Sequence, residues 1–268
     1  MLCIKSLYVS YAKKQTALKK ISLTISPIGF ISIIGESGSG KTTFLKCLSK
    51  NLKYKGLISI DGKDIQKFSK KEESYYKNKF LSFLTQDFSL IDELNVKENI
   101  VLPFSLRKEK TVETKLISVL NSLNLSENFL DKKINELSQG ERQRVALARV
   151  ILNDSQIILC DEPTGNLDSK NSREIYTILK KLSQTKLVIV VSHNDYLTEE
   201  FSDRIIRLDK GEIIEDKIIN KKENISSYFD IKDNESTSFN KFSLKITNRL
   251  IIKKLPLTLI IIFLTALC

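Results

Sequence analysis

Several features are missing from this sequence, and each absence excludes a class of protein. The four cysteines are scattered without CxxC spacing, and the chain has a single histidine, so we expect neither a zinc site nor a disulfide framework. These cysteines are Cys3, Cys47, Cys160 and Cys268. The N-terminus lacks a charged start followed by a long apolar stretch and a small-residue cleavage site, which excludes a secretory signal. We therefore expect reduced thiols in a chain that begins inside the cell.

The composition supplies enough apolar residues for a core and an excess of positive charge. Of the 268 residues, 41% are hydrophobic, which suffices for one large domain or two small ones and argues against extensive disorder. Lysine and arginine number 43 against 32 aspartates and glutamates, a net charge of +11. Such a charge is typical of proteins that bind nucleic acid or anionic lipid, and it does not by itself identify the partner.

Apolar, β-branched runs alternate with helix-like stretches, which predicts an α/β fold with a buried parallel sheet. The expected strands are Leu2–Val9, Ile21–Ile25, Phe30–Ile34, Leu57–Ile60, Phe80–Leu84, Ile157–Cys160, Leu187–Val191 and Arg204–Leu208. The stretch between Thr85 and Ile157 has little strand character, and apolar residues have helical spacing across Thr111–Leu123. We expect a helical subdomain to be inserted there.

A glycine-rich segment follows the expected strand Phe30–Ile34. It consists of Gly35, Glu36, Ser37, Gly38, Ser39, Gly40, Lys41, Thr42 and Thr43, which fits the GxxxxGK[ST] pattern of a phosphate-binding loop. Its glycines let backbone N–H groups point at phosphate oxygens, and the helix that follows presents its positive dipole end to the same anion. We expect Lys41 to reach the β- and γ-phosphates of a nucleotide and the Thr42 hydroxyl to bind Mg²⁺.

Two carboxylates follow the expected strand Ile157–Cys160. Asp161 and Glu162 therefore lie at the C-terminal edge of a buried strand, which is where open α/β sheets bind their ligands. Adjacent buried acids without a cation would be costly. We expect Asp161 to hold Mg²⁺, directly or through water, and Glu162 to polarise the attacking water as general base.

The segment Leu137–Glu141 reads LSQGE and opens a strongly helical stretch. Ser138 and Glu141 form an S-x-x-E capping box, so the N-terminal amides of this helix can face an anion. Placed between a phosphate loop and an acidic strand, the segment resembles the LSGGQ signature of ATP-binding-cassette (ABC) proteins. Gln139 stands where that family commonly has glycine, whereas the amides of Ser138 and Gly140 remain, so we expect activity with altered affinity for the nucleotide.

Further residues match the family in its order, although each alone could be an ordinary packing or surface residue. Gln86 corresponds to the Q-loop glutamine that senses Mg²⁺ and water, and Tyr11 to the aromatic residue that stacks on adenine. His193, the only histidine, corresponds to the switch histidine that contacts the γ-phosphate. The segment 166–168 resembles the D-loop, through which each protomer touches the other's site.

The resemblance covers residues 1–216 and implies a P-loop NTPase core with a parallel sheet, an antiparallel β subdomain and an inserted helical subdomain. It implies catalytic roles for Lys41, Gln86, Glu162 and His193, and Mg²⁺ ligation by Thr42, Gln86 and Asp161. Tyr11, the phosphate loop from Gly35 to Thr43, and Ser138, Gln139 and Gly140 would bind ATP. The family's mechanism implies a homodimer that sandwiches each ATP between the phosphate loop of one protomer and the signature of the other.

Three stretches narrow the resemblance to the macrolide-exporter and lipoprotein-release group. They are residues 86–100, 137–144 and 161–168. The resemblance implies an ATPase on the cytoplasmic face of the cell membrane that drives a transmembrane permease, fused or separate, by mechanotransmission. A peptide, bacteriocin or lipoprotein substrate is the first expectation, although nothing in the ATPase reads the substrate.

Two other functions are alternatives. The net charge of +11 favours a soluble ABC ATPase acting on nucleic acid or ribosomes, but such proteins usually have two cassettes in tandem or a long coiled coil, and neither is present. A regulatory or scaffolding subunit of a cell-envelope complex would bind ATP without turnover, and the intact Lys41, Glu162 and His193 argue against it. We therefore expect no nucleic-acid partner.

The composition changes after Asp216. Residues 217–240 are rich in Lys, Asn, Glu, Asp and Ser, as expected for a solvated linker. Residues 241–268 are expected to associate with the membrane, because four basic residues recur at every fourth position, as in an amphipathic helix on an anionic leaflet. These are Lys241, Lys245, Arg249 and Lys253. The apolar tail Leu255–Cys268 offers 14 residues, whereas a span needs roughly 20, so we expect the first part of a fused ATPase–permease with an incomplete membrane helix.

Overall fold

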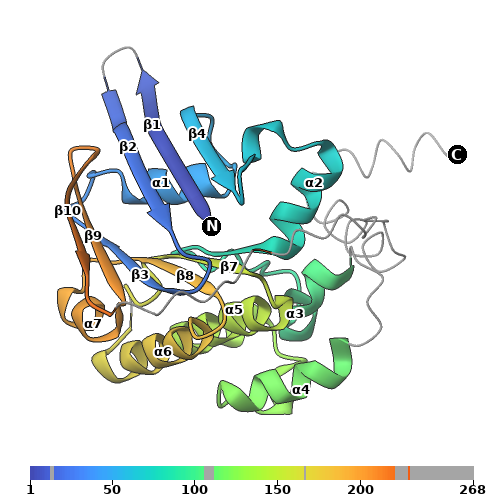
Figure 1. The fold of residues 1–268 in the computed structure, drawn as a ribbon. Helices are drawn as coiled ribbons and strands as arrows, with labels where there is room; N and C mark the ends of the chain where they lie inside the picture. Colours follow the sequence, from blue (N-terminus) through green and yellow to red (C-terminus); the bar gives the residue numbers. More distant parts are fainter. Residues whose placement is uncertain (13–14, 106–111, 166, 221–228, 230–268) are drawn as a thin grey trace, which may run out of the picture.

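The computed structural model describes residues 1–12, 15–105, 112–165, 167–220 and 229 of the chain. In this part of the chain two β-sheets are stacked with a helix between them, and further helices cover the outer face of the larger sheet (Figure 1). The predicted α/β class is confirmed.

A six-stranded sheet lies at the centre, in the order β10-β9-β3-β8-β7-β6. Its strands are β3 (Gly29–Ile34), β6 (Leu81–Leu84), β7 (Ile157–Asp161), β8 (Leu187–Val191), β9 (Arg204–Asp209) and β10 (Glu212–Ile218). All pairs are parallel except β9 with β10, and every residue of β3, β7 and β8 is buried. Continuous apolar runs form these strands because both faces of a parallel sheet are covered.

The second sheet is antiparallel, in the order β2-β1-β4-β5. Its strands are β1 (Leu2–Ala12), β2 (Gln15–Ile25), β4 (Lys55–Ile60) and β5 (Lys63–Asp64). The apolar runs do not indicate β5 or β10. The first has two residues, and the second is mostly exposed and rich in charged residues, so neither leaves a run of buried apolar residues.

Helix α1 (Lys41–Leu48) lies between the two sheets and shares a core with both. The opposite face of the central sheet is covered by a second group of helices (Figure 1). These are α3 (Val96–Ser105), α4 (Val112–Ser122), α5 (Gln139–Asn153), α6 (Ser169–Leu182) and α7 (Asp195–Phe201). Helices α3, α4 and α5 fall between β6 and β7 in the chain, where the sequence predicts a helical insertion. Helix α2 (Lys70–Tyr75) precedes a π-helical turn, Tyr76–Phe80, that leads into β6.

Neighbouring residues of the central strands point into different cores, because side chains alternate along a strand. Leu159 and Ile189 pack with α1 and the antiparallel sheet, whereas Ile158 and Val188 pack with α5 and α6. The phosphate loop, which opens α1, and the LSQGE segment, which opens α5, therefore belong to opposite faces of one sheet.

The end of the described chain continues past the expected ATPase boundary at Asp216. Strand β10 runs to Ile218, and Phe229 is buried with its ring centroid 5.4 Å from that of Phe80. Among the described residues, no helix has the length and apolar character needed to cross a membrane. The amphipathic and apolar segments predicted within 241–268, and residues 221–228 and 230–240 of the predicted linker, lie outside the described residues.

Candidate active site

The glycine-rich segment connects the C-terminal end of β3 to the first turn of α1. Gly35 and Gly40 have φ angles of 148° and 105°. A Cβ atom at Gly35 would lie 2.1 Å from the Leu208 carbonyl oxygen, and one at Gly40 would lie 2.5 Å from the Ala17 carbonyl oxygen. Glycine is required at both positions because neighbouring backbone approaches so closely. Helix α1 has no side-chain cap, so the N–H groups of its first turn remain available to an anion.

Lys41 is a cation enclosed by its own loop. Its side chain is buried, and Nζ donates to the carbonyl oxygens of Gly35 and Glu36 at 2.7 and 2.8 Å. Burial lowers the pKa of Lys41, while the nearby charges of Glu162 and Asp161 act in the opposite direction. The loop therefore holds a positive charge in place before any anion binds.

The acidic pair sits at the end of β7, beside the phosphate loop. Asp161 Oδ1 accepts a hydrogen bond from Thr42 Oγ1 at 3.0 Å. Glu162 has a φ of 51°, and its N–H donates to the Val191 carbonyl at 3.0 Å, which continues the pairing with β8. Burial raises the pKa of both carboxyls, that of Glu162 to about 7. A carboxyl with such a pKa is suited to accept a proton from water at neutral pH.

His193 lies two residues beyond β8 and contacts the second of these acids. Its Nε2 is 2.9 Å from Glu162 Oε1, and its side chain is 62% exposed, whereas that of Glu162 is 10% exposed. The imidazole therefore holds a buried carboxylate while presenting its other face to solvent. Such an arrangement can orient Glu162 toward a ligand in the cleft.

These residues line one cleft of about 460 Å³. The predicted residues that line it are Tyr11, Ser37, Gly38, Gly40, Lys41, Thr42, Thr43, Gln86, Glu162 and His193. Tyr11 is exposed at the end of β1, and its hydroxyl is 3.1 Å from Thr43 Oγ1. Thr16 and Ala17 of β2 also line the cleft, and no motif indicates them, because only the pairing of β1 with β2 brings them there.

The other predicted residues of the phosphate loop lie around this cleft rather than on its surface. Gly35 packs against the β9 backbone, the Glu36 carbonyl binds Lys41, and Ser39 is buried. The Ser39 hydroxyl has no hydrogen-bond partner among the described residues. A buried polar atom without a partner next to a phosphate-type loop fits a site that is completed by a ligand.

Ser138, Gln139 and Gly140 line a different cleft, of about 420 Å³, together with Leu167 and Asp168. The predicted capping box is present, since Ser138 Oγ accepts from the Glu141 N–H at 3.3 Å and Glu141 Oε2 accepts from the Ser138 N–H at 2.7 Å. Asn166 of the predicted D-loop lies outside the described residues. The two clefts share no lining residue, so a single copy of the chain does not bring the two sets together.

Two oxygen donors at the first cleft are suited to Mg²⁺: Thr42 lines the cleft, whereas Asp161 does not line it and is hydrogen-bonded to Thr42. The Thr42 hydroxyl and the Asp161 carboxylate are hydrogen-bonded at 3.0 Å. Within the described ranges no group of three or more His, Cys, Asp and Glu side chains could hold a metal. Mg²⁺ usually keeps several waters and binds through one or two protein oxygens together with substrate phosphates, so the small donor set fits it.

A sequence model of the family described as "ABC transporter" matches residues 18–165. The chain is also 37% identical over 210 residues to the bacitracin export ATP-binding protein BceA of Halalkalibacterium halodurans, with 77% of this chain and 83% of that protein covered. The chain belongs to the ABC transporter family. As an ABC ATPase it binds ATP through the P-loop fold described above.

The same ABC ATPase is similar to two further proteins. It is 36% identical over 222 residues to the macrolide export ATP-binding/permease protein MacB of Bdellovibrio bacteriovorus, which covers 81% of this chain but 34% of that protein. It also resembles a dimeric, post-hydrolysis structure of the ATP-binding cassette MJ0796 bound to ADP and Pi. The TM-score is 0.74 at 33% sequence identity, with 82% of this chain and 100% of that chain covered.

Proposed function

We propose that this ABC ATPase hydrolyses MgATP as a homodimer and thereby drives a transmembrane permease from the cytoplasmic face of the cell membrane. The observation that carries the proposal is the separation of the two clefts, one lined by the phosphate loop and Glu162 and the other by the signature. A two-fold dimer in which each signature covers the partner's phosphate loop would complete two sites at once. The dimeric MJ0796 cassette supports this arrangement.

In this proposal each residue of the phosphate-loop cleft has one task. Lys41 and the N-terminal amides of α1 bind the phosphates, and Tyr11 stacks on the base. Thr42, Asp161 and Gln86 hold Mg²⁺, which when bound neutralises phosphate charge. Glu162 accepts the proton of the attacking water.

The remaining residues orient the water and complete the site. His193 fixes the Glu162 carboxylate, to which it is already bonded at 2.9 Å, and contacts the γ-phosphate. Ser138, Gln139 and Gly140 of the partner protomer close the site from the other side, with their amides toward the same phosphate. Both copies must therefore be present for turnover.

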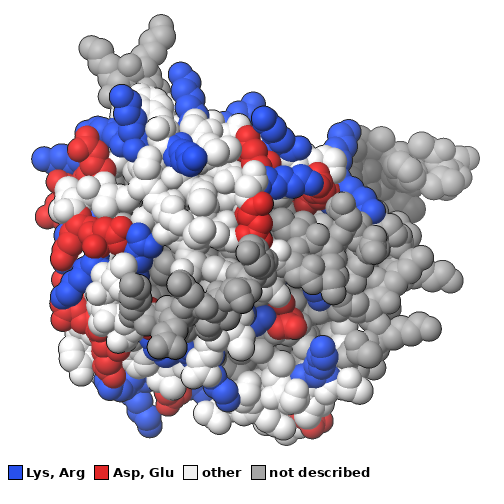
Figure 2. Space-filling model, in the orientation of Figure 1, with Lys and Arg blue, Asp and Glu red and all other residues white. Residues whose placement is uncertain are grey.

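We further propose an export or mechanotransmission function with a peptide, bacteriocin or lipoprotein substrate. The names of two relatives, a bacitracin export and a macrolide export protein, support export. The second name combines ATP-binding and permease functions, which agrees with a division of this chain into an ATPase domain, whose last strand ends at Ile218, followed by a linker to residue 240 and a membrane-associated segment 241–268. On the face shown in Figure 2, the Lys and Arg of the described residues are interspersed with Asp and Glu rather than gathered in one basic patch, so this face does not favour a nucleic-acid partner.

The substitution Glu162→Gln tests the proposed chemistry. It removes the base and leaves the phosphate loop intact, so we expect ATP binding to persist while turnover falls by about 10²- to 10⁴-fold. Size-exclusion chromatography with MgATP should show an accumulated dimer, and a phosphate-release assay should show the loss. Glu199→Gln, an exposed change on α7, is the matched control and should behave as the unmodified protein. Near-normal hydrolysis by Glu162→Gln would overturn the assignment.

A further inference from the structure

The loop that follows β6 carries Gln86 and has an unusual backbone. Phe88 and Ser89 have φ angles of 62° and 46°, so two successive residues with side chains adopt the left-handed region. This region is unfavourable for residues other than glycine. Such a conformation persists only where the surroundings hold it in place.

Hydrogen bonds within the loop account for part of this restraint. Thr85 Oγ1 is 2.5 Å from Asp87 Oδ1 and 2.6 Å from Ser89 Oγ, and the Phe88 N–H donates to the Thr85 carbonyl at 2.9 Å. The hydrogen bond from the Thr85 hydroxyl lowers the pKa of Asp87, with a smaller contribution from Ser89. These bonds join side chains and one amide, but they do not satisfy the carbonyl oxygens of the two left-handed residues.

Arg149 of α5 satisfies both carbonyls. Its Nη1 donates to the Ser89 carbonyl at 2.9 Å and its Nη2 to the Phe88 carbonyl at 2.8 Å. Burial lowers the pKa of Arg149, which the charge of Asp87 partly offsets. The rigid, planar fork of a guanidinium matches two neighbouring acceptors, and a lysine ammonium does not reproduce that geometry.

The far end of the same loop is held by another side chain, that of Asn99 of α3, which is buried. Its Nδ2 donates to the carbonyls of Ile91, Leu94 and Asn95 at 3.0, 3.2 and 3.0 Å, and its Oδ1 accepts from the Ile91 N–H at 2.8 Å. Gln86 therefore lies on a loop that is bound to two helices of the helical insertion. Of these, α5 is the helix that the signature opens.

We propose that Arg149 is a positioning residue that fixes Gln86 relative to the signature helix α5. The proposal rests on the proposed function of Gln86 at the Mg²⁺ and water. Because the guanidinium joins α5 to the Phe88 and Ser89 backbone, a displacement of α5 moves the Gln86 side chain with it. A movement of the signature on one side of the sheet is thereby transmitted to the phosphate-loop cleft of the same protomer.

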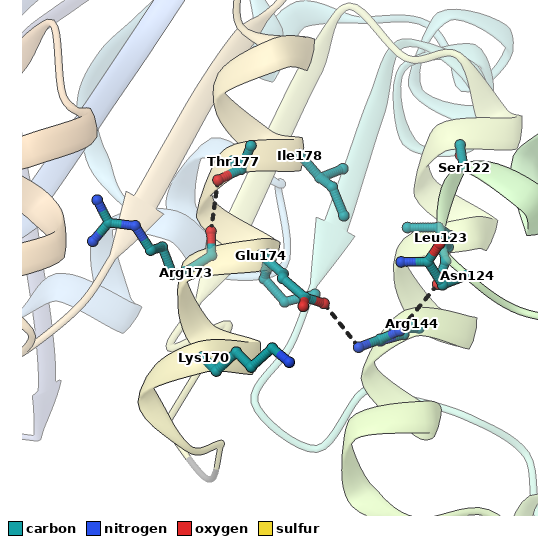
Figure 3. Close-up of a pocket in the computed structure, with 10 residues that line it drawn as sticks. Ser122, Leu123, Asn124, Arg144, Lys170, Arg173, Glu174, Thr177 and Ile178 are labelled. Carbon is teal, nitrogen blue, oxygen red and sulfur yellow. Dashed lines mark hydrogen bonds and ion pairs between the residues drawn. The ribbon is translucent and has the colours of Figure 1, made fainter.

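Arg144 provides a matched control on the same helix. Its Nη1 donates to the Leu123 carbonyl at 3.3 Å and its Nη2 to Glu174 Oε2 at 2.9 Å, across the pocket between α6 and the end of α4 (Figure 3). Its Nη2 also donates to Asn171 Oδ1 at 2.9 Å, and the residue lines the signature cleft. Arg144 is thus an arginine of α5 whose contacts lie with the ends of α4 and α6 and with the signature, away from the loop of Gln86. Arg144→Lys changes the same chemistry without touching that loop.

A double-mutant cycle tests the proposal. We expect Arg149→Lys to lower kcat about tenfold with little change in the KM for ATP, because the phosphate loop and Tyr11 remain in place. In a Gln86→Ala background, Arg149→Lys should lower kcat no further, whereas the effect of Arg144→Lys should multiply with that of Gln86→Ala. Independent, multiplying effects of Arg149→Lys and Gln86→Ala would overturn the proposal.

Amide hydrogen exchange separates this proposal from the function on which it rests. Arg149→Lys should speed exchange at residues 86–90, and Arg144→Lys should not; unchanged exchange in Arg149→Lys contradicts the positioning role. If Gln86→Ala leaves kcat intact, the proposed function of Gln86 fails, and exchange alone decides whether Arg149 holds the loop. If Arg149→Lys does not fold, kcat and amide exchange are measured on Ser89→Pro instead. This substitution disrupts the loop itself, since proline cannot adopt the positive φ of Ser89.

Discussion

The phosphate-loop cleft and the signature cleft differ in how their charged groups are balanced without a ligand. In the first, the pKa of Glu162 is raised to about 7 and that of Lys41 is lowered, both because the groups are buried. In the second, hydrogen bonds from Ser138 lower the pKa of Glu141. One cleft keeps its charged groups in an unfavourable environment, which is typical of sites that carry out chemistry, and the other is satisfied by its own cap.

The two faces of the central sheet therefore carry groups with different properties. The groups that we propose exchange protons or bind phosphate lie on the α1 side, where burial shifts their pKa values. The signature side offers a preformed helix N-terminus whose cap is complete before it meets a partner. Under the proposed dimer mechanism, this arrangement keeps the reactive groups inactive until a second copy binds.

The largest effect is expected when the phosphate-loop cleft is disabled in one protomer and the signature cleft in the other. Lys41→Ala removes the buried cation, and Gly140→Arg fills the signature cleft, where a Cβ atom meets nothing closer than Leu167 at 3.9 Å. Each variant alone should lose turnover by about 10³-fold or more. An equimolar mixture should recover about one quarter of the original activity, because half of the random dimers contain one intact composite site.

Phosphate release from the mixture, measured over a range of total protein concentrations, is the observable. Lys53→Ala, an exposed change just beyond α1, serves as the control for the loss of a lysine. If the mixture is no more active than the mean of its parents, the two clefts do not combine in trans.

The pH dependence of turnover tests the proposed role of Glu162 in the phosphate-loop cleft. Since Glu162 must be ionised to accept a proton and burial raises its pKa to about 7 in the ligand-free protein, kcat/KM should increase about tenfold per pH unit below that value and then level off. The signature variant Gln139→Gly should show the same profile. A kcat/KM that stays flat between pH 5.5 and pH 8, when chemistry limits the rate, contradicts the assignment of Glu162 as base.

The same carboxyl affects stability with the opposite sign. Its folded-state pKa of about 7 lies above the ordinary value of 4.5, so the folded protein binds this proton more tightly than the unfolded chain does. The free energy of unfolding of the ligand-free protein therefore decreases as pH increases from 4.5 through 7. Glu162→Gln should remove this loss, on the order of 2 kcal/mol in the free energy of unfolding at pH 8. Urea unfolding of both proteins at pH 5 and pH 8 measures the difference.

The smallest effect is expected on the signature side. Gln139→Gly restores the residue common in the family and removes a side chain from the cleft, but the capping box of Ser138 and Glu141 stays in place. Because a side chain is removed from the cleft, we expect the KM for ATP to fall by about threefold or less. We expect kcat to stay unchanged, since glycine at an exposed first helical position destabilises the helix by at most about 1 kcal/mol. A tenfold loss of kcat would show that the glutamine side chain itself takes part in turnover.

The central sheet could be predicted from the sequence because each of its buried strands is a continuous local pattern. Leu187–Val191 is apolar throughout and Phe30–Ile34 is apolar except for Ser32, as burial on both faces of the sheet favours. The residues of the phosphate-loop cleft are grouped for a similar reason. Most of them follow directly on the ends of neighbouring parallel strands, so their convergence at one edge follows from the strand pattern.

What escaped prediction depends on contacts between residues far apart in the chain. Arg149 binds carbonyls 60 and 61 positions away, and backbone acceptors leave no pattern in a sequence. Phe229 lies in a stretch whose composition predicts a solvated linker, yet it is buried beside Phe80, and its N–H donates to Asp61 Oδ2 at 2.8 Å. The apolar residues of this stretch follow no regular period from which the burial of one of them could be inferred.

The contact between His193 and Glu162 has a practical consequence, because the chain contains no other histidine. A sample labelled with nitrogen-15 at histidine gives the resonances of one imidazole, with no assignment needed. Since the ring is bonded to the buried carboxylate and open to the cleft, its chemical shifts and coupling pattern change when Glu162 gains a proton or a nucleotide enters. The protein therefore contains its own magnetic-resonance reporter for a single active-site contact.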